Sequence, residues 1–325
     1  MLIYHNEVPD FLRPFLAAPA LRRLGGVGMN CGCEYTSFRR FYALPGYSRL
    51  DHSLGCALIV WHFTAERAPT LAALFHDAAS PVFAHSVDFM RGDYLSQEST
   101  EEGLEALLKR DKAIADALAA GGLGWEQVVN YRLYPIADNP SPRLSSDRLE
   151  YTLGNALRYG LADEGTLQGY YNDITVAAAE DGAPELAFQT ESAAAGFGRT
   201  ALACSRIYVS EEDRYSMQRL SELLRDALTG SVLTPEDLYR TEPEVIARLE
   251  AHPLFRRRWR DFRGLREILR GDEIPPGEGR VIPAKKRYIN PLLAGRGRLA
   301  DLDSDFGRAL REYLAEPQDT PLGGR

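Results

Sequence analysis

Two histidines and two aspartates, spread over three segments of the chain, could together bind a metal ion. They are His52 in SRLDHSLG, the adjacent His76 and Asp77 in LFHDAASPVFAH, and Asp147 in SSDRLEY. Asp77 lies in an apolar run, where a carboxylate needs a compensating ion pair or a metal. Two imidazoles and two carboxylates form a mixed nitrogen and oxygen set that suits Mn, Fe, Co, Ni or Zn and leaves positions for water and substrate.

Helical periodicity predicts the segments that must position these four residues. Apolar residues recur at three- and four-residue spacing over 49–66 and 68–78, and a Ser/Asp cap opens a helix at 145–161. Further helices are expected over 99–118, 165–179, 190–204, 211–229, 235–249 and 303–316. The Pro- and Gly-rich segment 271–293 predicts extended chain or a short hairpin. The sequence therefore predicts an all-α fold with a minor extended segment.

Composition limits the classes of partner. The chain has 325 residues, 45% of them hydrophobic, so it can bury a large core. Its formal charge of −8 disfavours duplex nucleic acid but allows a local basic pocket for a small phosphorylated compound. Neither a signal-like N-terminus nor an apolar run of about 18–20 residues is found, so we expect a cytoplasmic protein with no membrane partner. Homo-oligomer formation stays open.

The four residues and their surroundings resemble the HD-domain phosphohydrolase superfamily, whose signature is H…HD…D. SRLDHSLG is similar to the R-x-x-H-S-L-G segment of the subset that contains deoxynucleoside triphosphate triphosphohydrolases. LFHDAASPVFAHSVD aligns with that subset's HD-x-x-x-x-P-F-S-H-x-x-D segment, and DRLEY with D-[KR]-x-[DE]-Y. The resemblance covers residues 24–155 and implies an HD-domain helical core over 1–180, with a mainly helical extension over 181–325 packed on it.

The resemblance also implies a role for each matched residue. The ligands of one divalent metal ion would be His52, His76, Asp77 and Asp147, with an additional Mg²⁺ left open. Substrate would be bound by Arg49, Arg148 and Tyr151. Arginine suits this role because its guanidinium group binds phosphate oxygens in a bidentate manner. The residues that could orient phosphate or transfer protons would be His85, Asp88 and Glu98.

Two basic segments lie outside the resemblance. Lys285, Lys286 and Arg287 are three adjacent cations in an acidic protein, so they could bind substrate phosphate, although solvated surface charge is the alternative. The run RRRWRDFRGLR at 256–266 has the spacing of an amphipathic helix with a solvated face. Its functional alternatives are an oligomer contact and an allosteric nucleotide site.

The chain departs from the triphosphohydrolase pattern at two pocket histidines. Ser80 and Gln97 occupy these positions. This weakens the triphosphate assignment without affecting the metal ligands. We therefore expect a phosphohydrolase that cleaves a phosphate ester or anhydride of a nucleotide, or of a related small phosphorylated compound, by means of a metal-activated water. The alternatives are an HD-domain sensor that binds metal and nucleotide without turnover, and an oligomeric module stabilised by metal.

Overall fold

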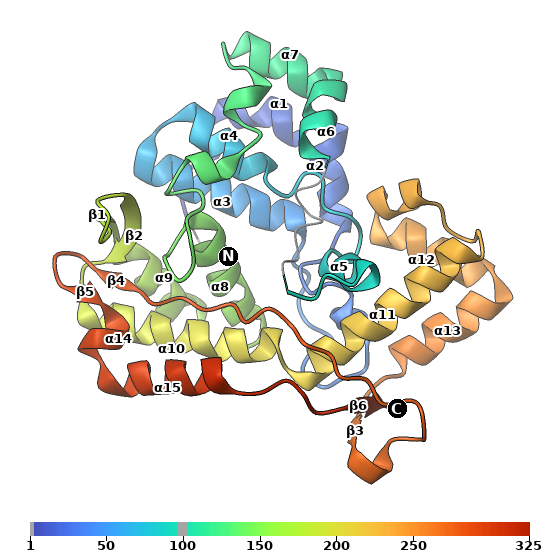
Figure 1. Ribbon diagram of the computed structural model, residues 1–325. Helices are drawn as coiled ribbons and strands as arrows, with labels where there is room; N and C mark the ends of the chain where they lie inside the picture. Colours follow the sequence, from blue (N-terminus) through green and yellow to red (C-terminus); the bar gives the residue numbers. More distant parts are fainter. Residues whose placement is uncertain (1–2, 96–102) are drawn as a thin grey trace.

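The computed structural model describes residues 3–95 and 103–325, and helices dominate this part of the chain (Figure 1). The prediction of an all-α fold is confirmed, with a few short strands as a minor addition. Among the described residues, no helix combines the length and the apolar character needed to cross a membrane.

Three helices form the part of the fold that carries the predicted ligands. They are α3 (Arg49–Thr64), α4 (Arg67–Phe75) and α8 (Ser146–Arg158), and α3 packs against both of the others. Shorter helices cover the α3–α4 pair at the top of Figure 1: α1 (Arg13–Leu16), α2 (Pro19–Arg23), α6 (Leu104–Arg110) and α7 (Lys112–Ala120). Their apolar side chains form one of three buried clusters.

Local signals fix where α3 and α8 begin. Ser48 and Asp51 form a capping box, in which the Asp51 amide donates to the Ser48 hydroxyl at 3.2 Å and the Ser48 amide donates to the Asp51 carboxylate at 3.0 Å. The Ser145 hydroxyl accepts from the Arg148 amide at 3.3 Å. These caps place His52 and Asp147 in the first turns of their helices, and α3 packs against α8.

The remaining helices form two groups in the lower half of Figure 1. One group lies beside the small sheet: α9 (Glu164–Asn172), α10 (Glu191–Tyr208), α14 (Leu299–Leu302) and α15 (Ser304–Ala315). The other lies on the opposite side: α5 (His85–Arg91), α11 (Glu211–Thr229), α12 (Glu242–Ala251) and α13 (Pro253–Arg263). Two buried apolar clusters extend through these groups and contain residues from both sides of residue 180. The predicted division at that residue stays a prediction.

The helix predicted over 165–179 is wrong in its second half. Helix α9 ends at Asn172, and Ile174–Ala178 form strand β1, which pairs antiparallel with β2 (Pro184–Phe188). The β-branched side chains of Ile174, Thr175 and Val176 favour this strand. Strands β4 (Leu292–Leu293) and β5 (Gly297–Arg298) complete the order β1-β2-β4-β5. A separate antiparallel pair joins β3 (Ile268–Arg270) to β6 (Leu322–Gly324).

Two further helix predictions need correction. Residues 99–102 of the helix expected over 99–118 lie outside the described ranges, and the rest is divided at Asp111, whose carboxylate accepts from the Ala113 amide at 3.0 Å and so begins α7. The helix expected over 235–249 begins as a 3-10 turn, Pro235–Tyr239, before α12. Residues 271–293 contain extended chain but no hairpin within themselves, and in Figure 1 this orange-red segment runs across the front of the molecule to β4.

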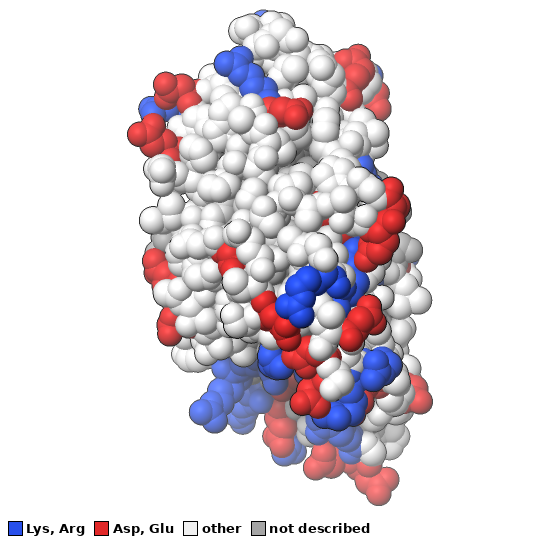
Figure 2. Space-filling view, turned by 90° about the vertical axis from the view of Figure 1, so that its left-hand side faces the viewer, with Lys and Arg blue, Asp and Glu red and all other residues white. Residues whose placement is uncertain are grey.

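The charged side chains are unevenly spread on the face that carries the small sheet. Figure 2 shows a broad central area with almost no Lys, Arg, Asp or Glu, while charges of both signs gather along its lower and right-hand edges. Basic and acidic side chains are interleaved there, as expected of a solvated surface.

Candidate metal centre and substrate pocket

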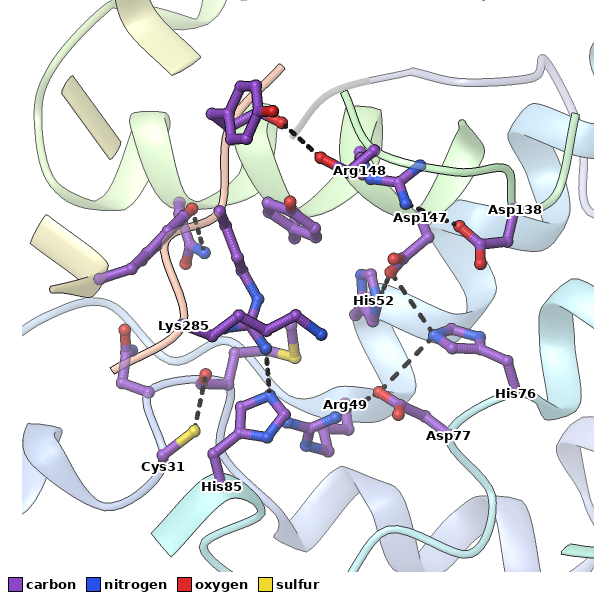
Figure 3. A pocket seen from close by; sticks show the side chains of 18 of the residues that line it. Cys31, Arg49, His52, His76, Asp77, His85, Asp138, Asp147, Arg148 and Lys285 are labelled. Atoms are coloured by element: carbon purple, nitrogen blue, oxygen red, sulfur yellow. Dashed lines mark hydrogen bonds and ion pairs between the residues drawn. The ribbon is translucent and has the colours of Figure 1, made fainter. Parts of the chain in front are cut away.

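The structure brings the four predicted ligands together. His52 projects from α3, His76 and Asp77 follow the end of α4, and Asp147 lies in the first turn of α8 (Figure 3). The Nε2 atom of His52 is 3.1 Å from Oδ1 of Asp147, and Nε2 of His76 is 3.7 Å from that same oxygen. Oδ2 of Asp77 is also 3.7 Å from Nε2 of His76. Nitrogen and carboxylate oxygen donors therefore converge on one small volume.

The hydrogen bonds of both imidazoles suit metal binding. Nδ1 of His52 is 2.6 Å from Oε2 of Glu150, and Nδ1 of His76 is 2.7 Å from the carbonyl oxygen of Ala73. Because a carboxylate and a carbonyl only accept, each Nδ1 carries the proton and donates it. For His52, burial lowers the pKa, but Cys56, Asp147 and Glu150 outweigh it and raise that pKa well above its ordinary value, so Nε2 also carries a proton that a metal ion would displace. The Nε2 atoms of both rings point toward the site. Metal-binding histidines are held in this way by a neighbouring carboxylate or carbonyl, so the donor set fits a divalent metal.

Glu150 was not predicted as a site residue. Its carboxylate is buried and also accepts from the hydroxyls of Tyr47 and, at 3.3 Å, Tyr4. Glu150 lies one turn after Asp147 on the same face of α8, so the sequence spacing could have predicted that its carboxylate lies near the site.

A cation and a hydroxyl hold Asp77 in its charged form. Arg49 donates to Oδ2 of Asp77, and the hydroxyl of Ser80 donates to Oδ1 at 2.9 Å. Burial alone would raise the pKa of Asp77, but Arg49, His76 and the other close donors outweigh it and lower that pKa well below its ordinary value. The same balance holds at Asp147: burial would raise its pKa, but the nearby His52 outweighs burial and lowers the pKa of Asp147 to about 2. Both carboxyl groups are thus ionised at neutral pH.

Cys56 offers a second combination of ligands. Potential donor atoms of His52, Cys56, His76 and Asp147 lie within 4.8 Å of one another. However, the sulfur of Cys56 is 3.6 Å from Nδ1 and 3.7 Å from Nε2 of His52, so it lies beside the ring rather than ahead of Nε2. Burial raises the pKa of this thiol to about 12, which opposes the thiolate form that binds metals. Asp77, whose Oδ2 is 3.7 Å from Nε2 of His76, stays the predicted fourth ligand although it lies outside this group of four.

The ligand set opens into a cavity of about 750 Å³. All six residues predicted to bind substrate line this cavity: Arg49, Arg148, Tyr151, Lys285, Lys286 and Arg287. The last three come from the extended segment before β4, so the C-terminal half of the chain supplies one wall. The volume falls in the range of about 300–1,000 Å³ that is typical of small-molecule sites.

The cations in this cavity differ in their existing contacts. Arg148 donates to the side-chain oxygen of Asn139 at 2.8 Å and to its carbonyl at 2.6 Å, and so braces the loop before α8. The ammonium group of Lys286 donates to the carbonyls of Tyr313 and Leu314, each at 2.8 Å, at the end of α15. These two cations therefore support the cavity wall. Arg49 pairs with Asp77 and Arg287 donates to His85, so these two cations are also held in place by neighbours within the cavity.

His85 lies on another wall of the cavity. Nδ1 of His85 donates to Asp88 at 2.8 Å, and its Nε2 accepts from Arg287 at 3.1 Å. Burial lowers the pKa of His85 to about 4; the hydrogen bond that His85 donates to Asp88 opposes this shift, and the charges of Arg287 and Arg49 add to it. The imidazole is therefore neutral near pH 7 and positions Arg287, rather than supplying a proton itself.

The other two predicted catalytic residues have different outcomes. Asp88 is buried and does not line the cavity among the described residues, so its contact with His85 makes it a positioning group. Glu98 and Gln97 lie outside the described ranges.

The turn before α5 directs His85 into the cavity. Phe83 and Ala84 form this turn and have positive φ angles of 57° and 38°, although neither is a glycine.

Sequence reasoning missed a group of polar residues in the cavity wall. These are Asn30, Asn155, Tyr159, Tyr208 and Asp213, and Arg287 lies close enough to Asp213 to act against the rise in its pKa. The Asn155 amide donates to the Tyr208 hydroxyl at 3.0 Å, while its buried oxygen has no hydrogen-bond partner among the described residues. Burial raises the pKa of Asp213 to about 8, so this carboxyl group is largely protonated at pH 7. These groups come from distant segments, and no local motif marks them.

The comparisons with known proteins agree with this geometry. No family model matches the chain. The metal-dependent phosphohydrolase cns2 of Cordyceps militaris is 28% identical over 160 residues, which are 49% of this chain and 44% of that protein. The uncharacterized protein YdhJ of Bacillus subtilis is 23% identical over 254 residues, 77% of this chain and 74% of that protein.

A solved structure extends the likeness to nearly the whole chain. The crystal structure of a hypothetical protein from Aquifex aeolicus has a TM-score of 0.61 and 16% identity, and the match covers 92% of this chain and 89% of that one. At this identity, the likeness shows a shared fold. The chain spans less than half of the Cordyceps protein, so that relative speaks for the matched region alone.

Proposed function

We propose that this protein is a metal-dependent phosphohydrolase of the HD superfamily, acting on a nucleotide or a related small phosphorylated compound. The observation that carries this proposal is the convergence of His52, His76, Asp77 and Asp147 in a cavity that also contains Arg49 and Arg287. The Cordyceps relative, named a metal-dependent phosphohydrolase, supports the same class of reaction.

The metal would be held by the Nε2 atoms of the two histidines and by one oxygen each of Asp77 and Asp147. When bound, such an ion supplies Lewis-acid chemistry and lowers the pKa of a coordinated water. Its identity among Mn, Fe, Co, Ni and Zn stays open, as does an additional Mg²⁺.

The residues of the chain perform the remaining tasks. Arg49 and Arg287 neutralise the charge on the phosphate oxygens as the bond to the leaving group breaks. Neutral His85 accepts from Arg287 and so fixes where its guanidinium group points. The Tyr151 hydroxyl, which has no hydrogen-bond partner among the described residues, is available to the substrate.

Two groups of residues in the cavity wall suggest the kind of molecule that fills it. One group offers metal ligands and cations, which suit a phosphate group. The other offers neutral donors and acceptors together with the rings of Tyr159 and Tyr208. A nucleoside carries hydroxyl groups, ring nitrogens and a flat face, so it complements this second group, including the unpaired oxygen of Asn155.

The sensor alternative differs from the enzyme in turnover alone, because both would bind the metal. It was suggested by Ser80 and Gln97, which replace two pocket histidines. In the structure, Ser80 donates to Asp77 and thereby stabilises a predicted ligand, while Gln97 lies outside the described residues. A measurement of turnover therefore decides between the two.

A hydrolysis screen tests the proposal. The purified protein, loaded with each candidate metal, is incubated with nucleoside mono-, di- and triphosphates and simple phosphodiesters, and released phosphate, pyrophosphate and triphosphate are measured. We expect turnover of at least one nucleotide, lost in Asp147→Asn and retained in Cys56→Ala. Absence of hydrolysis across the panel in a metal-loaded wild type would refute the enzymatic proposal and favour the sensor.

A further inference from the structure

A second cavity lies on the far side of the segment that lines the first. Its volume is about 470 Å³, and its walls come from residues 34–37, from Tyr42 and Ala43, and from the end of α13 at Arg260, Arg263 and Gly264. The basic helix at 256–266, to which the proposed function assigns no role, therefore contributes directly to a cavity.

The two arginines at this cavity have no ion-pair partner. Arg260 and Arg263 are one turn apart, and the part of the chain that the structure describes offers neither of them a carboxylate. Other arginines of α13 are paired: Arg258 lies 2.6 Å from Asp226, and Arg257 lies 3.8 Å from Asp261. The apolar face of the helix is buried through Trp259 and Phe262, so the two guanidinium groups are held on a fixed support.

The other walls suit an anion that carries an organic group. Tyr42 is 67% exposed, so its ring is available for contact. An oxygen of Glu34, Oε2, is buried without a hydrogen-bond partner among the described residues. Burial and the nearby Glu242 raise the pKa of Glu34 well above its ordinary value. The carboxyl group therefore holds its proton near pH 7 and carries no charge that would repel an anion, while its Oε1 atom lies beside Gly28.

The same short segment forms a wall of both cavities. Met29, Asn30 and Cys31 line the metal-site cavity, and Glu34 to Ser37 line the second one. Between them, Gly32 has φ of 89°, and an added Cβ would lie 2.3 Å from Leu220, so this turn requires glycine. Residues 29–37 thus connect the two cavities along the chain.

Hydrogen bonds connect this segment to the turn that positions His85. The Tyr35 hydroxyl donates to Glu242 at 2.8 Å, and the same carboxyl group accepts from the amides of Gly28 at 2.9 Å and Phe83 at 3.3 Å. The Tyr35 ring also packs on Trp259, with centroids 5.4 Å apart. Contacts thus run from α13 to both the 29–37 segment and the start of α5.

We propose that the second cavity binds a small phosphorylated effector, whose phosphate is held by Arg260 and Arg263, and that occupancy is coupled through residues 29–37 to the metal-site cavity. Two guanidinium groups recognise phosphate oxygens by charge-assisted hydrogen bonds. Such a coupling is reciprocal, so the effector and the substrate would change each other's affinity by the same factor.

The test measures binding without turnover. Inorganic pyrophosphate, AMP and ADP are titrated by calorimetry into metal-stripped wild type, into Arg260→Gln/Arg263→Gln, and into Arg257→Gln as the matched control on the same helix. We expect at least one probe to bind the wild type and the control alike, and to bind the double variant about tenfold or more weakly. Comparison of pyrophosphate with AMP and ADP shows whether the organic group contributes.

Hydrogen exchange measures the coupling in the same samples. The probe should slow exchange at the amides of Met29 and Cys33, which donate to the carbonyls of Tyr47 and Asn30, and this protection should vanish in the double variant. Equal binding to wild type and double variant, absence of binding by all three probes, or unchanged exchange over 29–37 would each overturn the proposal. Because neither readout needs hydrolysis, failure here is distinct from failure of the proposed function.

Discussion

The hydrogen bond between Glu150 and His52 makes a quantitative prediction about metal affinity. Both side chains are almost fully buried, and the bond length is 2.6 Å. In Glu150→Gln, the amide oxygen can still accept from Nδ1 of His52, and the amide nitrogen can face the hydroxyl of Tyr4. The variant therefore keeps the shape of the site but loses the negative charge that makes the imidazole a stronger ligand.

Loss of such an outer carboxylate weakens metal binding by about 10- to 100-fold, or about 1.4–2.7 kcal/mol. The affinity is measured by competition with a chromophoric chelator, at a pH where the chelator binds tightly. Tyr4→Phe is the matched control, since it removes a 3.3 Å hydrogen bond to the other oxygen of Glu150 and leaves His52 untouched. Metal affinity of Glu150→Gln within about twofold of wild type, in a variant that unfolds at the wild-type temperature, would refute this reasoning.

Three further predictions concern the cavity walls. The carboxyl group of Asp213 has a pKa of about 8 in the folded protein, against 3.8 as the ordinary value in the unfolded chain. Between these values the folded state binds more protons than the unfolded state, so the protein loses stability as the pH rises through this interval. Urea unfolding of Asp213→Asn should therefore show a growing advantage over wild type from pH 5 to pH 8, and a constant difference would contradict the buried, protonated carboxyl group. Arg148→Gln should lower the free energy of unfolding by about 2–3 kcal/mol through loss of its charged hydrogen bonds to Asn139; unchanged urea midpoints would show that the loop before α8 does not need this brace. Tyr151→Phe should unfold like wild type but lower kcat/KM about five- to tenfold, the effect of one lost hydrogen bond to substrate, and wild-type kinetics would remove Tyr151 from the substrate contacts.

That the four predicted ligand side chains lie close together could be predicted, because each belongs to a short segment with a strong local pattern. Caps at Ser48 and Ser145 fix where two of the helices begin, and apolar periodicity fixes which faces they bury. The sequence preferred Asp77 to Cys56 only through the resemblance, because local patterns do not show which of the two side chains faces the imidazoles. That choice depends on where Arg49 and the sulfur of Cys56 lie relative to the imidazoles, which is a matter of tertiary packing.

The group of polar residues in the cavity wall was beyond local patterns for the same reason. Asn30, Asn155 and Asp213 are far apart in the chain: Asn30 lies in a turn, Asn155 on α8 and Asp213 on α11. The strand Ile174–Ala178 was mistaken for helix because a short run of small and apolar residues has no decisive period. Its pairing with β2 is reinforced from outside the hairpin, where Glu185 accepts two hydrogen bonds from Arg298 of β5.

The most direct test of the account is to measure metal content and phosphate release in the same samples. Wild type, Asp147→Asn and Cys56→Ala are stripped of metal and then titrated with the ion that best supports hydrolysis. The account predicts that activity rises in proportion to bound metal in wild type and in Cys56→Ala, and that Asp147→Asn lacks both. Hydrolysis by the stripped wild type, or full metal binding by Asp147→Asn, would contradict the proposal that these residues form a catalytic metal site.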